Sequence, residues 1–193
     1  VGKELAISEF YDNGKKCGNF ALIQQQQEGF LPYWGIDQTL KYSDGLMHTD
    51  HYHCGFEIRA LFGMWLNTSQ ERFKLAYEKY LNWYIQNLYE NNTFPKFTPT
   101  TIYPIYTHSC SESIFCLATL LRKHDNLDDL LKKSYCWTIQ NMQHNSGQYI
   151  HMIKKVGKLF NKKIKITMFR HSQAWMLMAL SEYLVSLNQT EVN

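Results

Sequence analysis

The stretch from His53 to Leu66 reads HCGFEIRALFGMWL and is apolar on nearly every side apart from Glu57 and Arg59. A helix that is hydrophobic all round is covered on most of its sides in a folded protein. The run from Ser113 to Leu121 has the same character. These segments therefore predict a layer of inner helices.

The stretch from Glu71 to Glu90 has a different pattern. Its apolar residues recur at spacings of three and four, with charged and amide residues between them, which is typical of a helix with one buried face. These residues are Phe73, Ala76, Tyr77, Tyr80, Leu81, Tyr84 and Leu88. An amphipathic outer layer around an apolar inner layer predicts an all-α fold of stacked helical hairpins.

Residues 149–169 depart from the helical pattern. Apolar and polar residues alternate on both sides of Val156-Gly157-Lys158, which predicts a short β-hairpin. Lysines gather near its tip, at Lys154, Lys155, Lys158, Lys162, Lys163 and Lys165. A local lysine run of this kind is more often a solvated face than a binding patch.

Three histidines recur at near-equal spacing, and each begins an apolar segment. His53 and His108 are 55 residues apart, and His108 and His171 are 63 residues apart. This recurrence favours a repeated supersecondary unit over scattered histidines. We expect the functional site where the repeated units converge.

Composition sets broad limits on function. With 193 residues, of which 45% are hydrophobic and 15% aromatic, residues 1–193 can form a single domain with a substantial core. A formal charge of +3 is too small to indicate nucleic acid or membrane partners. Neither a membrane span nor a signal peptide is expected from the sequence. Five cysteines without a CxxC pair indicate reduced thiols and a cytoplasmic location.

Four motifs occur in an order that resembles a known group of proteins. They read DHYHCGF at 50–56, YPIYTHSC at 103–110, WTIQNMQ at 137–143 and MFRHSQAWM at 168–176. From about Gln24 onward the chain resembles bacterial proteins of poorly defined chemistry that are found alongside surface-polysaccharide genes. Those proteins look like α/α-toroids, similar to six-hairpin glycosidases, to the helical domain of glucuronyl epimerases and to terpene cyclases. The resemblance implies an α/α-toroid and a carbohydrate-active enzyme or enzyme domain.

The chain also departs from that group. Where the group has Thr, Gln and Trp, this chain has Cys54, Glu112 and His171. A full toroid needs roughly six hairpins, and this chain supplies about three. We therefore expect half a barrel, either the C-terminal part of a longer toroid or a half completed by another copy. Such a chain should self-associate or carry an exposed apolar edge.

The resemblance also implies where a site lies. In such toroids the inner helices run parallel and their N-termini gather at one mouth, which places His53, His108 and Arg170 together. Helix N-termini favour anions, and an arginine can hold a carboxylate or sulfate. His53 with Glu57, and His108 with Glu112, are i,i+4 pairs on one helix face. Each pair is a candidate catalytic acid/base couple.

Side chains around these pairs are candidates for binding a carbohydrate, preferably an anionic one. They are Asp50, Tyr52, Tyr103, Arg170, Gln173 and Trp175. The candidate site also has structural alternatives, and the histidines could be helix-capping or core residues. Glu57 and Glu112 could instead pair with Arg59 or Arg122, and the aromatic side chains could fill the core between the layers.

Three functions stay open on the sequence alone. The first is a carbohydrate-active enzyme acting on a surface or capsular polysaccharide by acid/base chemistry, as a hydrolase, lyase or epimerase. The second is a non-catalytic helical module that binds a glycan or a protein. The third is a zinc-dependent toroid like the lanthionine cyclases, with ligands drawn from His48, His51, His53, Cys54, His108 and Cys110. Those six residues lack a ligand spacing of their own, so we predict no metal and no cofactor.

Overall fold

The computed structural model describes residues 8–33, 49–157 and 160–190. Over these ranges the chain forms six α-helices, a π-helical turn and five short strands. The α-helices are α1 (Ser8–Gln24), α2 (His51–Thr68), α3 (Glu71–Leu88), α4 (Thr107–Leu121), α5 (Asp128–Met142) and α6 (Trp175–Thr190). The π-helical turn η2 (Phe169–Ala174) leads into α6, and a short 3-10 helix η1 (Asp125–Leu127) precedes α5.

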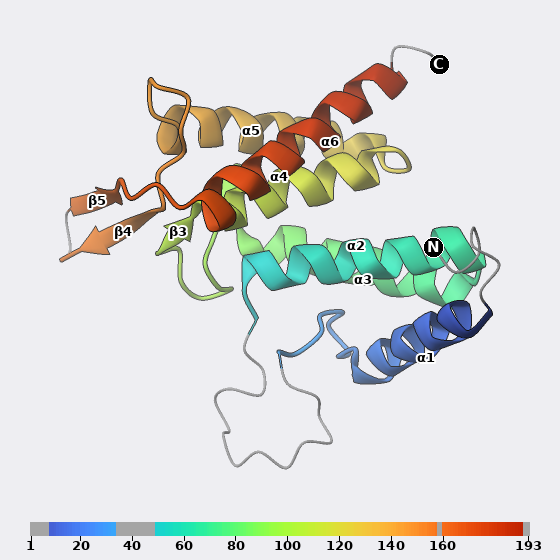
Figure 1. Cartoon of the computed structure of the whole chain (residues 1–193). Coiled ribbons are helices and arrows are strands. Elements are labelled where there is room, and N and C mark those ends of the chain that lie inside the picture. The colour runs from blue at the N-terminus through green and yellow to red at the C-terminus, as the bar shows by residue number, and fades with distance from the viewer. Residues whose placement is uncertain (1–7, 34–48, 158–159, 191–193) are drawn as a thin grey trace.

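Helix α4 is the centre of the molecule. All but three of its fifteen residues are buried, and it packs against α2, α5 and α6. Helices α2, α4 and η2–α6 begin at the same end of the molecule, beside the short strand β3 (Ile105–Tyr106) (Figure 1). This arrangement confirms the predicted half-barrel of α/α-toroid hairpins, with α2, α4 and α6 as the inner helices.

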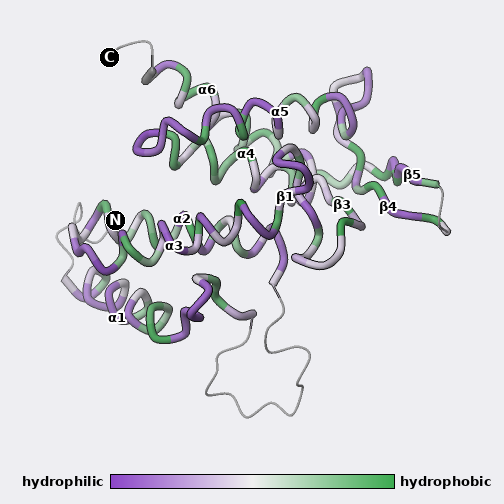
Figure 2. The backbone as a smooth tube through the Cα atoms, turned by 180° about the vertical axis from the view of Figure 1, so that it is seen from behind, coloured by the Kyte–Doolittle hydropathy of each residue, from purple (hydrophilic) through white to green (hydrophobic). Residues whose placement is uncertain are grey.

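The outer helix α3 also follows the prediction. The seven apolar residues that recur at spacings of three and four are all buried. In Figure 2, hydrophilic and hydrophobic residues alternate along α3, as they do along α1 and α5. Among the helices that the structure describes, none is both long and apolar enough to cross a lipid bilayer.

The predicted β-hairpin is present. Strand β4 (Met152–Val156) pairs antiparallel with β5 (Phe160–Ile164). The sequence did not predict that β3 joins β4 as a third strand, through the pairs Ile105–Ile153 and Tyr106–Met152. Because β3 is followed directly by α4, the hairpin is anchored at the start of the central helix. A second small hairpin joins β1 (Tyr89–Glu90) to β2 (Phe94–Pro95).

A buried ion pair joins α2 to α4. The Arg59 guanidinium donates Nε and one terminal nitrogen to the two Glu112 carboxylate oxygens, at 2.8 and 2.9 Å. The Glu112 side chain has no solvent exposure, and the Arg59 guanidinium lies 3.8 Å from the centre of the Phe115 ring. The two helices approach closely at Gly55, where a Cβ atom would lie 2.5 Å from Glu112 Cγ.

Two glycine substitutions in α2 should therefore have opposite effects. Gly55→Ala should lower the free energy of unfolding by about 2 kcal/mol, because the new methyl group overpacks a carboxylate that Arg59 holds in place. Gly63→Ala should raise it by up to about 1 kcal/mol, because nothing lies within 4 Å of that position and alanine favours the helix. Urea denaturation of both variants measures this. Equal effects would contradict the close approach at Gly55.

Candidate functional site

The first turn of α2 holds a histidine against a carboxylate. Asp50 is the N-cap of α2, and its Oδ1 accepts a hydrogen bond from the His53 backbone N–H at 3.0 Å. Its Oδ2 lies 2.5 Å from His53 Nδ1. This hydrogen bond raises the pKa of His53 above its ordinary value, although partial burial opposes it. With Nδ1 held by Asp50, His53 presents its Nε2 to a ligand.

His108 lies in the first turn of α4, and its pKa is shifted in the opposite direction to that of His53. Its ring stacks on the Tyr106 ring, with centroids 4.8 Å apart and planes 23° apart. Burial lowers the pKa of His108 to about 4, so the imidazole is neutral at pH 7. Its Nδ1 is buried and has no hydrogen-bond partner in the described part of the chain, which leaves Nε2 as the nitrogen that a ligand can reach.

The Tyr52 ring brings the inner helices together. It meets the His53, His108 and Trp175 rings edge-on, with centroids 5.2, 4.8 and 5.3 Å away. These residues come from α2, α4 and α6, whose first turns we call the mouth. The predicted meeting of His53 and His108 is thus present, and Asp50, Tyr52 and Trp175 lie beside them.

Two further residues at the mouth escaped the sequence analysis. The Tyr106 ring lies between His108 and His151, with its centroid 5.5 Å from that of His151. His151 reaches this position because β4 pairs with β3, and its carbonyl accepts a hydrogen bond from the Thr107 N–H at 3.1 Å. A tyrosine two residues before a repeated histidine was the available signal for Tyr106. No signal pointed to His151, because its position depends on a strand pairing.

Glu57 lies one helical turn inside the mouth. Its carboxylate accepts a hydrogen bond from the Tyr80 hydroxyl at 2.6 Å. Burial raises the pKa of Glu57 to about 7, although the Tyr80 hydrogen bond and His53 oppose the shift. The spacing of apolar residues in α3 predicted that Tyr80 lies in the core, but it did not predict this contact.

Two predicted site residues have other surroundings than expected. Glu112 was predicted to form an acid/base couple with His108, but both of its carboxylate oxygens are held by Arg59. The structural alternative for Glu112 is therefore the one observed, and we leave it out of the acid/base set. Arg170 was predicted to hold an anion at the mouth beside His53 and His108. Its side chain is exposed in η2, and its role in the site stays a prediction.

Two predicted sugar-binding residues are engaged in holding the β-hairpin region. The Gln173 amide accepts a hydrogen bond from the Tyr149 N–H at 3.0 Å and donates one to the Tyr149 carbonyl at 2.8 Å. The Tyr103 hydroxyl accepts a hydrogen bond from the Asn161 amide of β5 at 2.8 Å. Gln173 therefore holds the backbone of Tyr149, and Tyr103 holds a side chain of β5.

Most of the candidate zinc ligands lie within the described residues. Over residues 8–33, 49–157 and 160–190, no group of three His, Cys, Asp or Glu side chains is arranged to hold a metal ion. Cys54 and Cys110 are buried in the core, and His51 is also fully buried, with Nδ1 2.9 Å from the Tyr84 hydroxyl. His48 lies outside the described residues. His171, the third histidine of the repeat, is exposed in η2.

The fold is similar to those of two carbohydrate-active enzymes. D-mannose isomerase superposes on 76% of this chain with a TM-score of 0.57 and 11% identity, and the GH76 α-mannanase of Bacteroides thetaiotaomicron on 99% with a TM-score of 0.63 and 14% identity. The chain spans 39% of the isomerase and 57% of the mannanase. No protein-family model and no curated sequence matches the chain. The similarity establishes the α/α-toroid class for the fold.

The raised pKa of Glu57 predicts a pH-dependent stability. The folded state binds this proton more tightly than the unfolded chain, so the contribution of Glu57 is full below about pH 4.5 and is lost as the pH rises through about 7. Glu57→Gln should therefore gain on the order of 2 kcal/mol relative to wild type between pH 5 and pH 8. Denaturation curves at both pH values measure this difference. A difference that does not change with pH would show that Glu57 is ionised freely in the folded state.

Proposed function

We propose that the chain is an enzyme, or part of one, that moves protons on a carbohydrate, as an isomerase or epimerase does. The observation that carries this proposal is the pair of histidines on either side of Tyr52. Their surroundings shift their pKa values in opposite directions, upward for His53 and downward for His108. Titratable neighbours whose pKa values are pushed apart are the usual mark of an acid and a base that work together.

The roles follow from the protonation states. Protonated His53, held by Asp50, can donate a proton from Nε2. Neutral His108 can accept one. Moving hydrogen between neighbouring carbon and oxygen atoms of a sugar needs a donor and an acceptor present at the same time. Both rings border Tyr52, so one bound sugar could reach both nitrogens.

Glycoside hydrolysis is less well supported. That reaction ordinarily uses two carboxyl groups that flank the bond to be cleaved. In the described part of the chain, the Asp50 carboxylate is bonded to His53 and that of Glu112 to Arg59. The Glu57 carboxylate, on α2, accepts a hydrogen bond from the Tyr80 hydroxyl of α3. These engagements favour proton transfer by histidines over a carboxylate pair.

Carbohydrate as the substrate class is supported by the fold and by the walls of the mouth. The similar structures are named as a mannose isomerase and an α-mannanase. Tyr52, Tyr106 and Trp175 provide flat, partly exposed rings on three sides. Aromatic faces of this kind suit the apolar side of a sugar ring.

Solvent deuterium exchange tests the proposed reaction. The chain is incubated in deuterated buffer with a panel of aldoses, ketoses, disaccharides and uronic acids, and NMR follows both the loss of carbon-bound protons and new products. His53→Gln and His108→Gln should each slow exchange at least about 100-fold. Asp50→Asn should move the alkaline limb of the pH profile to lower pH, because it removes the carboxylate that raises the pKa of His53, the proposed proton donor.

The control is His144→Gln, which changes an exposed histidine in the turn after α5. It should exchange at the wild-type rate. If the unaltered chain binds a glycan but exchanges no proton in any sugar, the function is that of a non-catalytic glycan-binding module.

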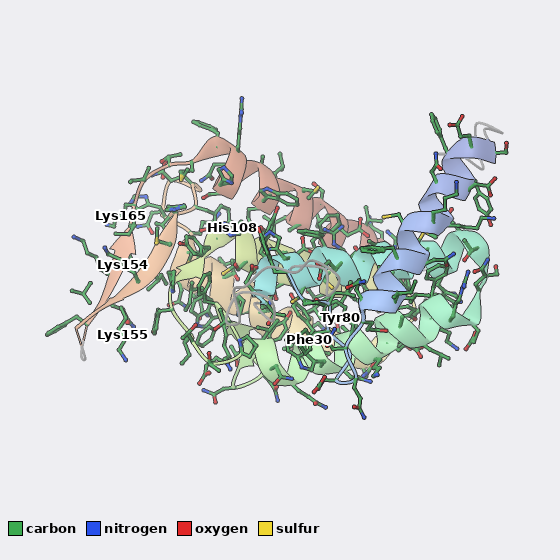
Figure 3. All side chains as sticks on the ribbon, turned by 90° about the horizontal axis from the view of Figure 1, so that it is seen from below. Phe30, Tyr80, His108, Lys154, Lys155 and Lys165 are labelled. Carbon is green, nitrogen blue, oxygen red and sulfur yellow. The ribbon has the colours of Figure 1, made fainter. Side chains whose placement is uncertain are left out.

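The β4–β5 hairpin favours an acidic glycan as the substrate. Lys154 lies directly across from Lys162, and such like-charged pairs cost stability unless an anion lies nearby. Figure 3 shows Lys154, Lys155 and Lys165 on this hairpin, beyond the end of α4 that carries His108. A polysaccharide bound at the mouth could continue along these exposed lysines.

A charge-neutralised hairpin tests the acidic glycan. Lys154→Gln with Lys162→Gln should weaken binding of a uronate-rich polysaccharide several-fold and reduce the salt dependence of binding. The reason is that the double variant lacks two lysine charges that can attract the uronate carboxylates. Lys132→Gln with Lys133→Gln, two exposed lysines of α5, is the matched control. Fluorescence anisotropy with labelled acidic and neutral polysaccharides at two salt concentrations provides the readout. Equal losses in both double variants would assign the effect to net charge alone.

A further inference from the structure

Helix α6 is apolar on two opposite sides. One side, which includes Met176, Ala179 and Tyr183, is buried, and α6 packs extensively on α4. The other side leaves large apolar side chains open to solvent, namely Leu177 (69% exposed), Leu184 (63%), Val185 (43%) and Met178 (38%). These four residues, which we call the α6 edge, recur at spacings of seven and so form one stripe along the helix. Figure 2 shows hydrophobic residues along the length of α6.

A hollow apolar surface lies at the other end of the half-barrel. A cavity of about 300 Å³ opens between α1 and α2, and its walls are almost entirely apolar. Small residues of α1, Gly14, Cys17, Gly18 and Ala21, line one side, and the α2 wall opposite is formed by Glu57, Ala60, Leu61 and Met64. We call this the α1–α2 cavity. The small side chains of the α1 wall leave room for a large side chain from outside.

The two surfaces stand at opposite ends of the stack of helices. Figures 1 and 2 both place α1 on one side of the α2–α3 layer and α5 and α6 on the other. The similarity to the α-mannanase covers 99% of this chain but only 57% of the α-mannanase. A complete toroid of that size therefore needs further helices, of the same order of size as this chain. Those helices would have to cover the protruding α6 edge at one end and fill the α1–α2 cavity at the other.

We propose that a second copy of this chain completes the ring, with the α6 edge of each copy seated in the α1–α2 cavity of the other. A two-fold axis along the barrel makes both contacts identical and leaves no edge open. Protruding leucines then meet a largely apolar cavity whose α1 wall consists of small residues, so shape and polarity match. The same axis keeps all inner helices parallel, as α2, α4 and α6 already are.

This pairing also completes the mouth. The N-termini of the inner helices of both copies would surround one opening, with His53 and His108 of each copy on opposite walls. The interface does not depend on the proposed reaction, because it follows from the apolar edges and the fold alone. A test of assembly can therefore succeed or fail independently of any activity.

Light scattering coupled to size exclusion is the first measurement. The chain should have twice its 22.9 kDa mass. Leu184→Asp should return it to the mass of one chain while leaving the circular dichroism spectrum unchanged, because Leu184 is exposed within each copy. Leu75→Asp is the matched control, since Leu75 is a leucine of α3 that is 60% exposed. That variant should stay dimeric.

Disulfide trapping then tests the orientation. Cys17 is an exposed cysteine in the α1–α2 cavity, so Leu177→Cys or Leu184→Cys should form a covalent dimer with Cys17 of the other copy on mild oxidation. The background carries Cys136→Ser, because Cys136 is also exposed. Adding Cys17→Ser should abolish the covalent dimer, and Leu75→Cys should not form one.

Two results would overturn the proposal. A monomer at every concentration would mean that the α6 edge is covered by something else, such as a helical segment of a longer polypeptide. A covalent dimer that persists after Cys17→Ser would mean that two α6 helices face each other, which cannot close a ring.

Discussion

The Arg59–Glu112 ion pair at the Gly55 crossing is the constraint on which the mouth depends. Glu112 has no contact with solvent, so its charge is tolerable only because Arg59 meets both of its oxygens. That requirement fixes how α2 and α4 are aligned along their lengths. Once their alignment is set, Tyr52 in the first turn of α2 falls against His108 in the first turn of α4. The geometry of the mouth follows from a contact one to two turns below it.

The two histidines of the mouth occupy similar positions but have different neighbours. His53 and His108 each occupy the first turn of an inner helix, yet one has a capping carboxylate beside it and the other has stacked aromatic rings. Since a carboxylate favours the imidazolium and burial favours the neutral ring, the proposed function takes its acid from one repeat and its base from the next. Glu57, which accepts a hydrogen bond from Tyr80 of α3, adds a third proton-binding group one turn farther along α2.

Much of this arrangement was accessible from the sequence. Spacing alone identified the buried face of α3, and alternation around Gly157 identified the β4–β5 hairpin. The three-residue separation of Asp50 and His53 is a local feature, so their contact is encoded within one turn. Contacts between distant elements were harder. Whether Glu112 contacts His108 or Arg59 depends on the alignment of α2 along α4. The position of His151 depends on the pairing of β3 with β4. Neither the helix alignment nor the strand pairing can be predicted from the spacing of residues.

The direct passage from β3 into α4 has a mechanical consequence. Tyr106 ends the strand and His108 is in the helix two residues later, with their rings stacked on each other. A strand that is hydrogen-bonded in a ladder transmits displacement along its backbone with little slack. Movement of the lysine-bearing hairpin would therefore reach the His108 ring through β3, with no loop between the strand and α4 to absorb it.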